Sequence, residues 1–112
     1  MASQRLEKIS TLFKRELSQI FLRESRTLGM GAMVSVTVVR VSPDLSTARV
    51  YVSIFGVPKK EDVLIHIRDN AKTIRHTLAQ IVKNQLRKTP ELHFYLDDSI
   101  DYAQNINELL KK

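Results

Sequence analysis

Apolar side chains near the N-terminus are spaced three and four residues apart, which is typical of an amphipathic helix. We expect this helix to span about residues 4–26, with Ser3 able to cap its start and Gly29 and Gly31 lying behind its end. Its apolar stripe consists of Leu6, Ile9, Phe13, Leu17 and Ile20.

Two segments rich in β-branched residues follow the first helix. Residues 33–41 alternate between apolar and polar for most of their length, and residues 47–55 alternate cleanly, so each segment predicts a strand. The intervening SPDLS run, residues 42–46, has the residue types of a tight turn. The sequence therefore predicts an antiparallel hairpin, whose second strand is ended by Gly56 and Pro58.

The rest of the apolar pattern predicts one long helix, a third strand and a short last helix. Helical spacing begins at Lys60, and Pro90 stops this helix at about residue 87 or 88. Residues 91–97 form the third strand, and Asp98 or Ser99 can cap a helix over residues 100–110. This order of elements predicts an α+β domain whose helices pack on one face of a small three-stranded sheet.

Composition narrows the class of protein. A chain of 112 residues builds one core, so we expect a single domain. The absence of cysteine excludes disulfides, thiolate metal sites and cysteine nucleophiles. No apolar run approaches the roughly 18 residues of a membrane span, and the N-terminus lacks the apolar core of a signal peptide. We therefore expect a cytoplasmic protein without a membrane partner.

The net charge of +6 is unevenly distributed along the chain. Residues 1–40 carry seven Lys/Arg and three acids, residues 41–90 carry nine and four, and residues 91–112 carry two and five. The first ninety residues are therefore basic, which favours polyanionic partners, and the C-terminal part is acidic.

Lysines and arginines gather on one side of each long helix. At about 100° per residue, five cations of the first helix point away from the apolar stripe, and those of the second share one flank without acids at helical spacing. Such rows can follow a phosphate backbone, although a basic, solvated face is the alternative. The first-helix cations are Arg5, Lys8, Arg15, Arg23 and Arg26. The candidate RNA-binding residues are Arg5, Lys8, Arg15, Lys59, Lys60, Arg68, Lys72, Arg75, His76, Lys83, Arg87 and Lys88.

Histidines and aromatic residues offer weaker candidates. His66, His76 and His93 have no thiol or carboxylate at ligand spacing, so we expect no metal site. Tyr51 and Phe55 share one strand face, and exposed strand aromatics can stack on bases. Because the Lys/Arg-Gly-aromatic run of RNA-recognition sheets is missing, ordinary packing is the preferred interpretation.

The acidic cluster Asp97, Asp98 and Asp101 could in principle serve acid–base or magnesium chemistry. A strand end followed by a helix cap with acids in its first turn explains the same spacing. No nucleotide-binding, hydrolase or metalloprotease motif is present. We therefore expect no catalytic site.

Four segments occur together in an order that points to one family. They are VTVVRVSPDLSTARVYVSIFG (36–56), IRHTLA (74–79), RKTPELHF (87–94) and DDS (97–99). The SPDL turn followed by ARVYV, together with PELxF, is the most specific part. With these segments the chain resembles ribosome-binding factor A, a family of bacterial assembly factors of the small ribosomal subunit, over nearly its whole length.

The resemblance implies a type II KH-like fold of order α-β-β-α-α-β over residues 1–98, followed by a short acidic helix or tail over residues 99–112. Family members carry a helix-kink-helix with an Ala-x-Gly step, which falls on Asn70-Ala71-Lys72 here. Because Lys72 favours helix where glycine would break it, we expect a kink that is either shallow or held by tertiary contacts alone. The absence of a GxxG loop argues against the usual KH clamp on single-stranded nucleotides.

The resemblance also implies a non-enzymatic factor that binds 16S rRNA and the free 30S subunit during late maturation and 16S rRNA processing, with a role in cold adaptation. We expect a monomer without cofactor or small-molecule substrate. The alternatives are a general KH-like RNA-binding protein, a protein-interaction module that uses the acidic C-terminal helix or a sheet edge, and a small enzyme that uses the aspartate cluster.

Overall fold

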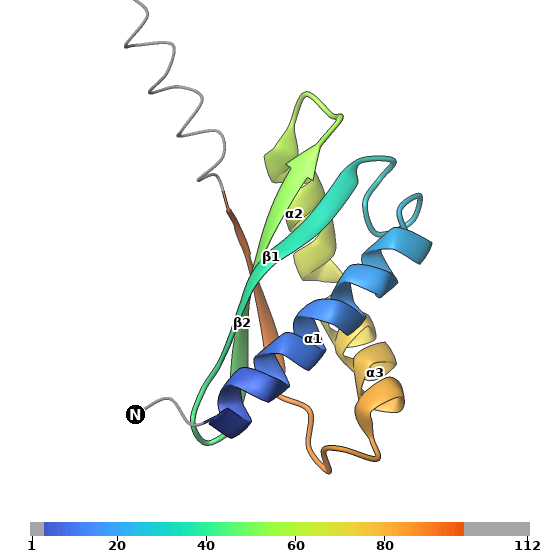
Figure 1. The fold of residues 1–112 in the computed structure, drawn as a ribbon. Coiled ribbons are helices and arrows are strands. Elements are labelled where there is room, and N and C mark those ends of the chain that lie inside the picture. Colours follow the sequence, from blue (N-terminus) through green and yellow to red (C-terminus); the bar gives the residue numbers. More distant parts are fainter. Residues whose placement is uncertain (1–3, 98–112) are drawn as a thin grey trace, which may run out of the picture.

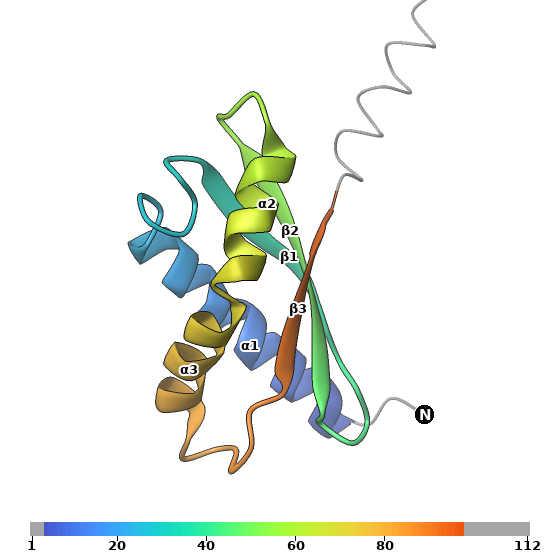
Figure 2. The ribbon, with the colours of Figure 1, turned by 180° about the vertical axis from the view of Figure 1, so that it is seen from behind.

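The computed structural model describes residues 4–97, which form three helices and a three-stranded sheet. Within this part of the chain, all three helices lie on the same side of the sheet (Figures 1 and 2). The α-β-β-α-α-β order confirms the predicted fold class. The elements are α1 (Gln4–Arg23), β1 (Met33–Val41), β2 (Thr47–Phe55), α2 (Lys60–Asp69), α3 (Ala71–Val82) and β3 (Glu91–Leu96).

The sheet has the strand order β1-β2-β3, so β2 is central. β1 and β2 form the predicted antiparallel hairpin, with Val39 opposite Val50. β3 runs parallel to β2, with Phe94 opposite Val50, because the chain crosses over through α2 and α3 before it returns to the sheet. β3 is consequently an edge strand that lies beside both of these helices (Figure 2).

The core lies between the helices and one face of the sheet. Phe13 and Leu17 of α1, Leu78 of α3 and Val50 of β2 are fully buried. The ring of Phe21 packs edge-on against that of Phe94, with the centroids 6.0 Å apart, which joins α1 to β3. The helical stripe and the strand alternation read from the sequence therefore meet in one core.

A bulge at Thr37 changes the face on which the residues of β1 point. Val36 pairs with Val52 and Val38 pairs with Tyr51, which leaves Thr37 as the extra residue. The buried valines of β1 are therefore Val36 and Val39, three positions apart, and Val38 lies on the other face. This bulge explains why the alternation of the first strand is imperfect.

The single long helix that apolar spacing predicts from residue 60 is wrong, because the chain breaks at Asn70 into α2 and α3, at the step where the family resemblance implies a kink. Asn70 has φ −102° and ψ 12°, outside the helical range, and its Nδ2 donates a hydrogen bond of 2.8 Å to the carbonyl of His66. A side-chain amide that competes for backbone carbonyls replaces the conformational freedom of glycine. The break therefore occurs two residues before Lys72, whose helix preference does not oppose it.

Both long helices end earlier than the periodicity predicts. α1 ends at Arg23, not at about residue 26, and hydrogen-bonded turns lead on to the buried Leu28. α3 ends at Val82, not at residue 87 or 88, although Leu86 is buried from the following loop. The helix predicted over residues 100–110 lies outside the described residues.

Candidate nucleic-acid interface

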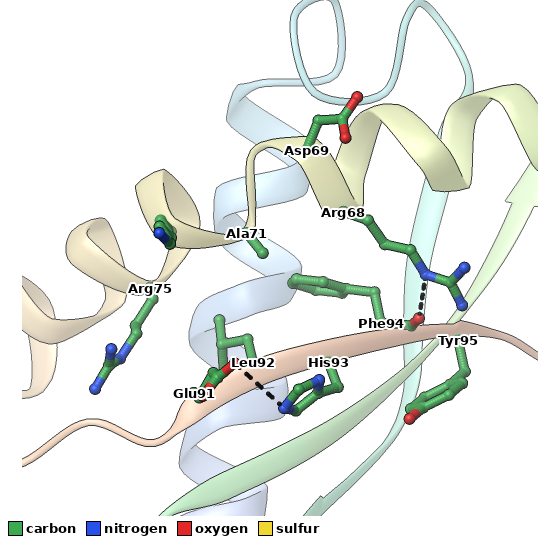
Figure 3. Close-up of a pocket in the computed structure, with 10 residues that line it drawn as sticks. Arg68, Asp69, Ala71, Arg75, Glu91, Leu92, His93, Phe94 and Tyr95 are labelled. Atoms are coloured by element: carbon green, nitrogen blue, oxygen red, sulfur yellow. Dashed lines mark hydrogen bonds and ion pairs between the residues drawn. The ribbon is translucent and has the colours of Figure 1, made fainter.

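A groove runs between the α2–α3 break and β3, with a volume of about 820 Å³ (Figure 3). One wall consists of residues of the two helices around the break, and the other consists of residues 91–95 of β3. We call this hollow the β3 groove. Its helix wall is formed by Arg68, Asp69, Ala71, Lys72 and Arg75.

Arg68 ties the helix wall to the strand wall. Its Nε donates a hydrogen bond of 2.9 Å to the carbonyl oxygen of Phe94, and its guanidinium carbon lies 5.8 Å from the centre of the Tyr95 ring. The remaining guanidinium N–H groups form no hydrogen bond within the described residues. Arg68 therefore presents a positioned set of donors, which suits recognition of a phosphate.

Of the three cations in the groove, Arg75 is the least available to bind a ligand. Its Nε and Nη2 both donate to the carbonyl of Thr89, at 3.0 and 2.7 Å, and the side chain is half-buried. Thr89 itself is buried at the end of the loop between α3 and β3. Arg75 thus holds this loop against α3 in addition to contributing charge to the groove.

Lys72 is exposed in the first turn of α3 and has no acidic partner among residues 4–97. Two acids, Asp69 and Glu91, also line the groove, and the Glu91 carboxylate lies 3.7 Å from Nε2 of His93. Arg68, Lys72 and Arg75 outnumber these acids, so the groove is positive. A positive groove beside an edge strand suits a polyanion.

The other predicted basic residues in and next to α2 and α3 lie outside the β3 groove. Lys59 precedes α2, and Lys60 begins it with Nζ 5.9 Å from the centre of the Phe55 ring. His76 is exposed on α3, and beyond the end of that helix the exposed cations are Lys83, Arg87 and Lys88.

The α1 cations form a separate surface. Arg5, Lys8 and Arg15 are exposed, and the last two line a second hollow of about 570 Å³ on α1. Because α1 packs against β1 and α3, it lies toward the sheet edge opposite β3. Of the predicted RNA-binding residues, the structure therefore brings only Arg68, Lys72 and Arg75 together in the β3 groove.

The weaker candidates have structural partners. Nε2 of His66 lies 2.7 Å from the carbonyl of Thr27, which ties α2 to the turn after α1. The hydroxyl of Thr37 donates to Asp97, and Asp98 and Asp101 lie outside the described residues. Among residues 4–97, no group of His, Asp and Glu is arranged to hold a metal ion, and no helix has the length and apolarity to cross a membrane.

Comparison with known proteins shows the family of this chain. Residues 5–110 match the family model "Ribosome-binding factor A". The chain belongs to the ribosome-binding factor A family. Ribosome-binding factor A of Cytophaga hutchinsonii is 42% identical over 112 residues, which cover 100% of this chain and 84% of the relative. That of Christiangramia forsetii is 41% identical over 110 residues, which cover 97% and 84%.

Solved structures of ribosome-binding factor A share the fold. The crystal structure of the Thermus thermophilus protein superposes with a TM-score of 0.67 and 27% identity, covering 81% of this chain and 94% of the other. A homology model of the same factor, fitted into a cryo-EM map of a 30S complex, has a TM-score of 0.53 and 23% identity, covering 73% and 96%. The family is one of ribosome-binding factors and not of enzymes, as the sequence predicted.

The strand wall of the groove was not predicted as part of the site. His93 and Tyr95 both line the groove, although the sequence offers His93 only as a possible metal ligand and gives no role to Tyr95. Their alternation with Leu92 and Phe94 in the third strand was the available signal. It indicates that they face away from the core, but not that the helix flank lies beside them.

Proposed function

We propose that this protein is a ribosome assembly factor that binds the small ribosomal subunit through 16S rRNA during late maturation and rRNA processing, and that it serves in the cytoplasm under cold conditions. The observation that carries the proposal is the positive β3 groove in a chain of the ribosome-binding factor A family. The complex of the Thermus thermophilus factor with the 30S subunit supports the same partner.

The groove binds rRNA through its phosphates. Lys72 supplies a mobile point charge, and Arg68 supplies guanidinium donors whose position is set by the Phe94 carbonyl. Contacts of this kind position an RNA and release counterions but do not read its sequence. Specificity for the subunit then comes from the shape of the folded rRNA that presents those phosphates.

The factor acts by differential binding and not by a chemical step. A ligand shifts a conformational equilibrium only by the difference in its affinity for the two states. We therefore infer that the protein stabilises one conformation of the precursor rRNA and delays use of the subunit until that site is formed. Chemical probing of precursor subunits with and without the protein tests this step, and identical reactivities would reject it.

Sedimentation of the tagged protein with small, large and joined ribosomal particles tests the partner. We expect it to travel with free small subunits, and to be lost from them after Lys72→Glu. Lys14→Glu is the matched control, because Lys14 is an exposed lysine on α1 outside both hollows and its reversal changes the net charge equally. Equal retention of Lys72→Glu and Lys14→Glu would show that the β3 groove does not bind the subunit.

A further inference from the structure

The sheet face that the helices leave uncovered carries two neighbouring rows of side chains. The strand register places Arg40 opposite Arg49 and Arg49 opposite His93, which forms a basic row across all three strands. The same register places Tyr51 opposite Tyr95, in the next row. We call these two rows the open face; their residues are Val38, Arg40, Arg49, Tyr51, His93 and Tyr95.

The basic row is unfavourable for the folded protein by itself. Arg40 and Arg49 are both exposed and lie directly opposite each other on antiparallel strands, where like charges repel. Neither arginine has an acidic partner within the described residues, whereas His93 lies 3.7 Å from the carboxylate of Glu91. Because the two arginines gain nothing from ion pairing within the described residues, they suit an external anion.

The aromatic row offers ring surface beside these charges. The rings of Tyr51 and Tyr95 are stacked, with centroids 5.5 Å apart and an angle of 29° between planes, and Tyr95 is 38% exposed. Residues two apart on a strand share a face at a distance of roughly 7 Å, so Arg49 adjoins Tyr51 and His93 adjoins Tyr95. Cations beside aromatic rings are the combination with which many proteins bind single-stranded nucleic acid.

The open face continues into the β3 groove. His93 and Tyr95 line that groove, and the Arg68 guanidinium lies over the Tyr95 ring (Figure 3). An RNA segment that leaves the groove therefore crosses β3 onto the open face without losing contact with cationic side chains. Such continuity favours RNA over an unrelated second partner.

We propose that the open face binds a single-stranded segment of RNA, with phosphates on the row Arg40, Arg49 and His93 and an unpaired base against Tyr51 and Tyr95. The proposal rests on the proposed function in that the ligand is RNA. It adds a second contact surface and requires the bound segment to be unpaired, because only an unstacked base presents its ring to an aromatic side chain.

Anisotropy of a labelled short oligouridylate measures the proposed contact. Replacing Tyr95 by leucine keeps an apolar side chain but removes the ring, and we expect affinity to fall about tenfold, whereas Tyr95→Phe retains it. Arg40→Gln with Arg49→Gln should reduce the slope of log affinity against log salt by about 1.4, or roughly 0.7 for each cation. Because the two arginines repel each other, this pair of changes should leave thermal stability unchanged or raise it.

The chain provides its own optical reporter. It has no tryptophan and three tyrosines, so in a Tyr102→Phe background the intrinsic fluorescence comes from Tyr51 and Tyr95. We expect the oligouridylate to quench this fluorescence, and inorganic phosphate at equal ionic strength not to quench it.

Several results would overturn the inference. One is that Tyr95→Leu and the two arginine changes leave the affinity for oligouridylate unaltered, while Lys72→Gln lowers that affinity. Another is that the protein does not bind oligouridylate even at low salt. In either case, retained sedimentation with small subunits would leave the proposed function standing. Equal binding of polyglutamate, insensitive to Tyr95→Leu, would instead identify an acidic protein as the occupant.

Discussion

Replacement of Arg75 by methionine should destabilise the fold through one loop. The change removes two hydrogen bonds, at 3.0 and 2.7 Å, to the carbonyl of Thr89, which is a buried residue. Hydrogen bonds from a charged donor contribute about 1.5–3 kcal/mol, and because Arg75 is only half-buried we expect a loss of about 2 kcal/mol. For a domain of this size that corresponds to a fall of roughly 10 °C in Tm.

Urea unfolding followed by circular dichroism measures the effect as a lower midpoint with an unchanged m value. Arg87→Met is the matched control, since Arg87 is exposed in the same loop, and we expect it to change the free energy of unfolding by less than about 0.5 kcal/mol. Equal effects of the two substitutions would refute the role of Arg75 as a loop anchor. If Arg75→Met is more destabilising than Arg87→Met, Arg75 supports the fold. Loss of RNA binding after Arg75→Glu would then not by itself show that RNA contacts Arg75.

Two further predictions concern the core and the hairpin turn. Leu78→Ala should lower the free energy of unfolding by about 3 kcal/mol, because Leu78 is fully buried where α3 meets the sheet; a loss under about 1 kcal/mol in urea would contradict this packing. Hydrogen bonds from Ser42 and Ser46 lower the pKa of Asp44 from 3.8 to about 2. The carboxylate therefore stabilises the fold above pH 3.8, and this contribution is lost as the pH falls through about 2. Acid titration of Asp44→Asn should lack that component, and an acid dependence identical to that of the original chain would count against it.

The strands of the hairpin could be predicted from the sequence because their determinants are local. Residues 33–41 and 47–55 form β1 and β2 with the bounds that alternation predicts. In the turn, Asp44 accepts hydrogen bonds from the hydroxyl groups of Ser42 and Ser46, which explains why those residue types occur there. No distant contact is therefore needed to predict the bounds of these two strands.

The helix break could not be read from apolar spacing, because both halves of the broken helix keep the same side toward the core. Ile67 and Ile74 are buried on either side of Asn70, and their spacing of seven residues fits a continuous helix. The signal was the polar residue itself, since asparagine competes for helix carbonyls. Leu86 accounts for the wrong end of the second helix in a similar way. It is buried from a loop, but its position continues the helical period.

Only the helix wall of the candidate site could be predicted from the sequence. A helical projection places Arg68, Lys72 and Arg75 on one flank, and the structure has these three residues along one groove. Which element faces that flank depends on β3 pairing with β2 and not with β1, a long-range choice that the projection does not contain. The β3 wall, including Tyr95, could therefore be identified only from the structure.

The outer edge of β3 also bears on the protein-interaction alternative. An added strand would need the outward backbone groups of β3, and the carbonyl of Phe94 already accepts a hydrogen bond from Arg68. α2 and α3 both pack beside this strand, so a peptide could pair there only after displacing that arginine. A partner at the β3 edge would therefore contact side chains and not backbone groups. These side chains are the cations of the β3 groove and, on the open face, His93 and Tyr95. Because cations and aromatic rings bind phosphates and bases, whereas strand addition depends on the backbone, this edge favours an RNA partner over an added protein strand.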